Sequence, residues 1–191
     1  MNSSKVGPAG PGIAAICAAF IFAIAWIVAA CGDTSWIVGE DTLSVLGISD
    51  VQVSADAFNY GCIVTGILFA IFGLGKFAFE TKCNRASGAM ILIAGIALIG
   101  VGVFTKDFGN GNPHLFVAYL FFLFLAISVI LSGIGDYYEK KTIPLAATVV
   151  LFMISLFSFA IQSLAMAEAV TVACALIWAV MQGSELAMSK A

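Results

Sequence analysis

The stretch that decides the fold class is Met90-Ile91-Leu92-Ile93-Ala94-Gly95-Ile96-Ala97-Leu98-Ile99. It contains no charged residue, and apolar side chains do not alternate with polar ones as they do in a strand of a membrane β-barrel. A continuous apolar run of this kind is typical of a helix that lies in lipid. We therefore expect helices, and not strands, to cross the membrane.

Six segments of the chain share this apolar character, and each approaches the roughly 20 residues that a helix needs to span a bilayer. They cover residues 12–31, 57–79, 87–104, 115–135, 144–161 and 169–188. The first also resembles a signal peptide, and Val28-Ala29-Ala30-Cys31 resembles a lipoprotein cleavage site, but we interpret this segment as a span. We expect an all-α bundle of six transmembrane helices that forms one integral membrane domain over residues 1–191.

The composition excludes several classes of protein. The chain has 191 residues, of which 62% are hydrophobic and 10% are charged, and its mean hydropathy is +1.09. Soluble domains contain about 45–50% apolar and about 25% charged residues, and a small one has too much surface to hide this excess. A soluble enzyme, a nucleic-acid-binding module and a disordered chain are therefore excluded. The expected partners are membrane lipids, another membrane protein or a second copy of the chain, and not nucleic acid.

The basic residues predict the orientation of the bundle. Seven of the eight are expected on one side of the membrane: Lys5, Lys76, Lys82, Arg85, Lys140, Lys141 and Lys190. Lys106 alone is expected on the other side. By the positive-inside rule, both termini are predicted to be cytoplasmic in a multi-pass protein of the cell membrane. The net charge of −3 then divides into +3 on the cytoplasmic side and −6 on the external side.

The first external connection, residues 32–56, is the longest segment expected outside the bilayer. It mixes acidic residues and serines with apolar residues such as Trp36, Leu43 and Leu46. A connection of this composition is expected to fold back over the external end of the bundle. Long ordered connections are often functional, so this one is interpreted either as a functional lid or as a plain cover.

Glycines recur every seven residues in two neighbouring spans. Gly66 and Gly73 lie in the second span, and Gly88, Gly95 and Gly102 lie in the third. This spacing keeps the glycines on one helix face, where they allow two backbones to approach closely. We expect the second and third spans to pack tightly here, and a ligand groove is the alternative.

The cysteines and the single histidine restrict the chemistry of any site. The five cysteines show no C-x-x-C spacing, and four of them lie in or beside apolar spans. Cys31 and Cys62 both lie near external ends of neighbouring spans, which leaves a disulfide between them open. One histidine excludes a three-histidine zinc site, so we expect no metal and no cofactor.

Polar residues within an apolar span are costly and are therefore candidate functional residues. On the cytoplasmic side, Lys76 and Glu80 are four residues apart and are expected to pair at the membrane interface. On the external side, Glu168 is expected either to be solvated or to turn into the bundle.

A group of polar residues at the external end provides the predicted site. The ligand-binding candidates are Ser44, Asn59, Asp107 and His114. His114 begins the fourth span, where the positive end of the helix dipole favours a neutral imidazole that could act as a base. Catalysis would combine His114 with Asp107 or Ser44. The alternative is that His114 is only a hydrogen-bonding anchor.

The same region carries a resemblance to a known family. Three groups of residues contribute to it: Asp41-Thr42-Leu43-Ser44-Val45-Leu46-Gly47, Phe58-Asn59, and Gly100-x-Gly102-Val103-Phe104 continuing to His114-Leu115-Phe116-Val117-Ala118 and Phe121-Phe122. With six spans, the chain resembles the prokaryotic membrane family known as domain of unknown function 998. That family is similar in architecture to eukaryotic six-span proteins associated with membrane lipids, of the autophagy-modulator and GPI-lipid-remodelling type.

The resemblance implies matching positions but no catalytic role. These positions are Ser44, Leu46, Gly47, Asn59 and His114. The family usually has a proline after the phenylalanine that ends the third span, whereas Thr105-Lys106 follows Phe104 here. This departure weakens any role inferred for Lys106 and Asp107.

Three functions remain open from the sequence. The first is a binding protein or accessory subunit whose external-leaflet pocket holds a lipid or another amphipathic ligand. The second is an intramembrane lipid-modifying enzyme, a hydrolase or transferase, with His114 as general base. The third is a small transporter, which ranks last because neither an internal repeat nor polar residues at mid-membrane are evident.

Overall fold

The computed structural model describes residues 7–189, and it is helical in the way that the apolar segments predict. The long helices are α1 (Ala9–Gly32), α2 (Gln52–Phe79), α3 (Lys82–Val103), α4 (Asn112–Tyr138), α5 (Thr142–Ile161) and α6 (Leu164–Met188). Two short 3-10 helices, η1 (Leu43–Ile48) and η2 (Phe108–Gly111), lie in the connections. All six long helices are apolar and long enough to cross a membrane. The prediction of an all-α bundle with six candidate membrane-spanning helices is thus confirmed.

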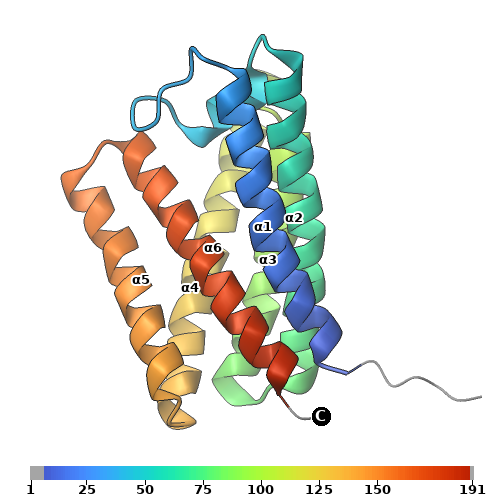
Figure 1. Cartoon of the computed structure of the whole chain (residues 1–191), viewed down its shortest axis with the longest axis vertical. Coiled ribbons are helices and arrows are strands. Elements are labelled where there is room, and N and C mark those ends of the chain that lie inside the picture. The colour runs from blue at the N-terminus through green and yellow to red at the C-terminus, as the bar shows by residue number, and fades with distance from the viewer. Residues whose placement is uncertain (1–6, 190–191) are drawn as a thin grey trace, which may run out of the picture.

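The helices run alternately up and down, as Figure 1 shows. Helix α2 packs between α1 and α3, α4 packs against α3, and α6 packs against α1. Helix α5 lies at the edge of the bundle and contacts only its sequence neighbours α4 and α6 closely. We call the end where α1 begins and α6 ends the terminal end, and the opposite end the loop end. Two of the basic residues used for the orientation, Lys5 and Lys190, lie outside the described residues.

Helices α2 and α3 touch backbone to backbone at the glycines. A Cβ atom built on Gly73 would lie 2.7 Å from the carbonyl oxygen of Gly88, and one built on Gly88 would lie 2.8 Å from that of Gly73. Gly66 and Gly95 form an equivalent reciprocal pair one step closer to the loop end. The predicted tight packing of the second and third spans is confirmed, and these glycines leave no groove between the helices.

The α1–α2 connection folds back onto the loop end of the bundle, as predicted. Leu43 and Leu46 of η1 are buried in the apolar core, and the indole Nε1 of Trp36 donates a hydrogen bond to the carbonyl oxygen of Thr42 at 3.1 Å. Asp33, directly after α1, accepts hydrogen bonds from Ser35 Oγ at 2.6 Å and Ser49 Oγ at 2.5 Å. One carboxylate therefore joins the beginning of this connection to its end.

We predict that Gly95→Ala destabilises the bundle by about 1–3 kcal/mol, the cost of inserting a methyl group into a closely packed interface. Gly133→Ala in α4 is the matched control, because its Cβ atom would meet its nearest neighbour at an ordinary 3.5 Å. It should leave stability unchanged or raise it slightly, since alanine favours a helix. Thermal unfolding in detergent measures both. Equal effects of the two substitutions would contradict the close approach of α2 and α3.

We also predict that the α1–α2 connection loosens in acid. The hydrogen bonds from Ser35 and Ser49 lower the pKa of Asp33 below its usual value of 3.8. A carboxyl group of this kind stabilises the fold above its unfolded pKa, and the stabilisation is lost as the pH falls through the folded pKa. Amide hydrogen exchange at Ser35 and Trp36, corrected for intrinsic rates, should therefore accelerate below about pH 4. In Asp33→Asn the corrected exchange should be fast at neutral pH already, and unchanged protection in that variant would refute the role of Asp33.

Candidate functional site

The predicted site residues lie at the loop end, on four different segments. Ser44 is in η1, and its Oγ lies 3.1 Å from Thr42 Oγ1. Lys106, in the α3–α4 connection, donates a hydrogen bond from Nζ to the same Thr42 Oγ1 at 3.1 Å. The fold thus brings Ser44, Thr42 and Lys106 into one hydrogen-bonded group, although Ser44 and Lys106 are 62 positions apart in the sequence.

Asn59 and His114 bind backbone carbonyl groups. Asn59 donates from Nδ2 to the carbonyl oxygen of Gly47 at 2.8 Å, which fixes η1 on α2. His114 is buried, and its Nδ1 lies 2.7 Å from the carbonyl oxygen of Phe104 at the end of α3. Because a carbonyl oxygen only accepts, Nδ1 of this ring carries a proton. Both side chains therefore fix connections of the loop end in place.

The structure does not assemble a catalytic group from Ser44, Asp107 and His114. Asp107 is exposed and accepts a hydrogen bond from Thr105 Oγ1 at 2.5 Å. Among the described residues, no hydrogen bond joins Asp107 or Ser44 to His114. The base–nucleophile contact that hydrolytic catalysis requires is thus absent from this conformation.

Glu168 belongs to the same end of the bundle. This half-buried residue is in the second turn of α6, and its Oε2 accepts a hydrogen bond from the backbone N–H of Leu43 at 3.1 Å. The carboxylate thus turns toward η1 and holds it against α6. Of the two alternatives predicted for Glu168, the structure favours the one in which the side chain turns into the fold.

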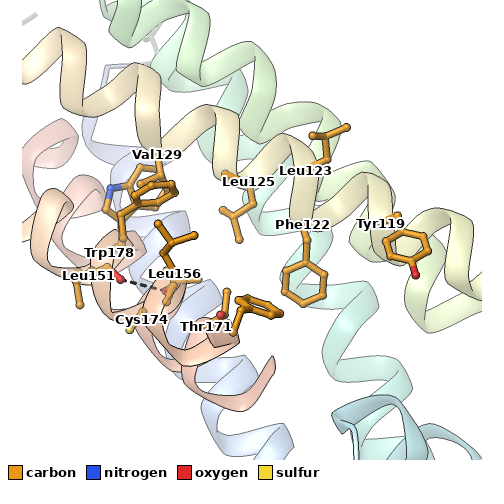
Figure 2. Close-up of a pocket in the computed structure, with 15 residues that line it drawn as sticks. Tyr119, Phe122, Leu123, Leu125, Val129, Leu151, Leu156, Thr171, Cys174 and Trp178 are labelled. Carbon is orange, nitrogen blue, oxygen red and sulfur yellow. Dashed lines mark hydrogen bonds between the residues drawn. The ribbon is translucent and has the colours of Figure 1, made fainter. Parts of the chain in front are cut away.

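An apolar cleft with a volume of about 410 Å³ lies between α4, α5 and α6. Figure 2 shows Phe122, Leu125 and Val129 of α4 on one side of this space and residues of α5 and α6 on the other. A second hollow of about 540 Å³ shares Val129 and Phe152 with the cleft and extends it along α4 and α5 toward the terminal end. Together they form an apolar groove along much of these two helices.

Few polar atoms face the cleft. Ser155 Oγ is satisfied by the carbonyl oxygen of Leu151 at 3.0 Å, drawn as a dashed line in Figure 2. Thr171 Oγ1 and the indole Nε1 of Trp178 are buried and lack a hydrogen-bond partner among the described residues. The predicted residues Ser44, Asn59, Asp107 and His114 do not line this space.

A different polar site lies inside the terminal half of the bundle and was not foreseen. Lys76 of α2 is only 2% exposed. Its Nζ donates hydrogen bonds to Ser132 Oγ of α4 at 2.7 Å and to Gln182 Oε1 of α6. The predicted interface pair of Lys76 with Glu80 is therefore wrong, because Lys76 is a buried residue of α2 and its ammonium group binds polar side chains of α4 and α6.

Further polar side chains complete what we call the Lys76 network. Gln182 Nε2 donates to Asp136 Oδ2 at 3.3 Å, so one amide bridges the buried ammonium and carboxylate groups. Ser87 of α3 joins the network through Ser132 Oγ at 2.9 Å. The spacing Ser128-x-x-x-Ser132-x-x-x-Asp136 places three polar residues on one face of α4, and this stripe is the sequence signal that could have revealed the network.

An ion pair lies just after the end of α4, close in sequence to Asp136. Lys141 Nζ lies 2.9 Å from Glu139 Oε2, and Asn84 Nδ2 donates to Glu139 Oε1 at 3.3 Å. Partial burial opposes ionisation of Glu139, but the hydrogen bonds from Lys141 and Asn84 outweigh it, so the pKa of Glu139 is lowered. Asp136 Oδ1 and Asn84 Oδ1 are buried without a partner among the described residues.

Metal and disulfide chemistry find no support in the described part of the chain. No group of three or more histidine, cysteine, aspartate or glutamate residues there could hold a metal ion. All five cysteines are free. Cys31 is exposed and Cys62 is buried, so the disulfide left open by the sequence does not form.

We predict that Lys76→Met destabilises the protein by about 3–5 kcal/mol, because it leaves the buried Asp136 without its counter-charge. The double variant Lys76→Met, Asp136→Leu should recover most of this loss, since apolar groups of similar volume can replace a buried ion pair at little cost. Unfolding in detergent measures both variants. A double variant as unstable as the single one would show that Lys76 and Asp136 do not act as a charge pair.

Comparison with known proteins identifies a family for this chain. A family model described as a protein of unknown function (DUF998) matches residues 16–185. This range includes η1, Asn59, His114, Glu168 and the whole Lys76 network. Searches of curated proteins and of solved structures found no match. The chain is therefore a member of the DUF998 family.

Proposed function

We propose that this protein binds a lipid or another amphipathic molecule whose apolar part occupies the cleft between α4, α5 and α6. The cleft itself carries this proposal. Its volume of about 410 Å³ is within the range of small-molecule sites, which is about 300–1,000 Å³. Its lining is almost entirely aliphatic and aromatic, and such a lining suits a hydrocarbon chain.

The position of α5 supports an occupant that enters from the membrane. Only Thr148 and Ser158 of this helix are buried, so α5 contributes little to the core. An apolar chain can therefore lie between α4 and α5 without displacing a polar contact. The groove that continues toward the terminal end gives room for a chain longer than the cleft.

The polar end of the ligand is placed at the loop end, beside Ser44, Asn59, Asp107 and His114. Asn59 and His114 shape this region through their backbone hydrogen bonds, and Ser44 belongs to its polar group. The distribution of basic residues favours cytoplasmic termini, and the ligand would then belong to the external leaflet of the cell membrane. An accessory role in a membrane complex is compatible with the same site. Lipid modification by His114 has no comparable support. The imidazole ring is buried, and among the described residues it forms no hydrogen bond with Asp107 or Ser44.

We predict that Ala175→Phe, which places a large side chain in the cleft, reduces copurifying lipid about tenfold. Native mass spectrometry of the purified protein counts the lipids that remain bound. The control is Ile177→Phe, because Ile177 is 58% exposed on the outer surface of α6 and should not affect the cleft. Ala126→Leu fills the cleft less severely from α4 and serves if Ala175→Phe does not fold. Wild-type lipid content in folded Ala175→Phe protein would refute the proposed site.

A further inference from the structure

We propose that Glu168 and Lys106 form a head-group site at the mouth of the cleft, and that it selects zwitterionic phospholipids with a primary amine, of the ethanolamine type. This inference rests on the proposed function, because it assumes that a lipid chain lies in the cleft. It goes further by naming the chemistry of the head group and two residues that recognise it. Neither residue was among the ligand-binding candidates of the sequence.

Glu168 lies on the same helix face as the cleft lining of α6. The cleft-lining residues Thr171, Ala175 and Trp178 follow Glu168 by three, seven and ten residues. These spacings place all four side chains along one stripe of a helix. Because α6 runs from the loop end to the terminal end, Glu168 is the next residue of this stripe beyond the cleft, at its loop-end mouth.

One carboxylate oxygen of Glu168 is free to accept a hydrogen bond from a ligand. Its Oε2 accepts a hydrogen bond from the backbone N–H of Leu43. Its Oε1 has no hydrogen-bond partner among the described residues and is not fully buried. A carboxylate oxygen accepts hydrogen bonds only, so its complement on a ligand is a donor. A charged ammonium donor forms the stronger kind of hydrogen bond with it.

Lys106 supplies the opposite charge nearby. Its Nζ donates to Thr42 Oγ1, in the residue next to Leu43, which Glu168 binds. Glu168 and Lys106 do not form an ion pair with each other among the described residues. An ammonium group has three donors, so Lys106 retains donors for a phosphate oxygen. Separated opposite charges of this kind complement a zwitterion, with its amine on Glu168 and its phosphate on Lys106.

The surrounding charge favours the amine over an anionic head group. Seven acidic residues and one basic residue lie at the loop end by sequence position, which gives this end a net charge of −6. A field of this sign disfavours a lipid with net negative charge. A quaternary ammonium carries no N–H to donate to Glu168 Oε1. The favoured head group is therefore a primary amine with an adjacent phosphate.

The test is competition between lipids of identical acyl chains. Purified protein is placed in nanodiscs that contain equal amounts of phosphatidylethanolamine, phosphatidylcholine and phosphatidylglycerol, and native mass spectrometry measures which lipid remains bound after extraction. The wild type should prefer phosphatidylethanolamine about tenfold, a ratio that corresponds to about 1.4 kcal/mol. Glu168→Gln should lose this preference and keep its total bound lipid, because glutamine retains the acceptor for the Leu43 N–H. The matched control, Glu40→Gln, changes an exposed acid of the α1–α2 connection and should keep the preference.

The outcomes separate this inference from the proposed function. If the wild type binds lipid without a preference for the ethanolamine lipid, the head-group site is overturned, but the proposal that a lipid chain occupies the cleft is not affected. An unchanged preference in Glu168→Gln also overturns it. Wild-type protein that retains no lipid at all refutes the proposed function, and the head-group site with it. Lys106→Gln should weaken binding of both phosphate-bearing zwitterions, phosphatidylethanolamine and phosphatidylcholine, and the absence of any effect would remove Lys106 from the site.

Discussion

The rest of the structure depends on how the bundle accommodates the buried ammonium group of Lys76. A charge within a membrane protein is costly unless polar partners surround it. Here the direct partners are Ser132 on α4 and Gln182 on α6, and Gln182 in turn donates a hydrogen bond to Asp136 of α4. The hydrogen bonds of the Lys76 side chain therefore hold α4 and α6 in a defined position at the terminal end of the bundle. They add to the apolar packing between the helices.

This constraint explains why an apolar cleft remains between α4 and α6. The Lys76 network joins the two helices near the terminal end, and Glu168 holds α6 to η1 at the loop end. Between these two attachments α6 packs against α1, and α5 covers the remaining space only in part. Trp178 is the common element, because it lines the cleft and its ring centroid lies 5.7 Å from Lys76 Nζ. The inner boundary of the cleft is therefore fixed by the network.

The sequence predicted the parts of the fold that depend on local pattern. Continuous apolar runs predicted the six helices, and the sevenfold spacing of glycines predicted the contact of α2 with α3. It also identified the loop end as a polar region containing Ser44, Asn59, Asp107 and His114. It did not predict the inward direction of Lys76, because a lysine three residues before the end of a span can equally reach the interface. The cleft was also missed, since it depends on the relative positions of three helices whose surfaces are all apolar.

The most direct test of the central claim is to map where a lipid chain contacts the protein. A phospholipid with a photoactivatable group within its acyl chain can be crosslinked to the purified protein and located by peptide mass spectrometry. The account predicts labels concentrated on the cleft-lining segments of α4, α5 and α6, residues 119–129, 151–159 and 171–178. Labels spread evenly over the outer faces of all six helices, with none enriched in the cleft, would contradict it.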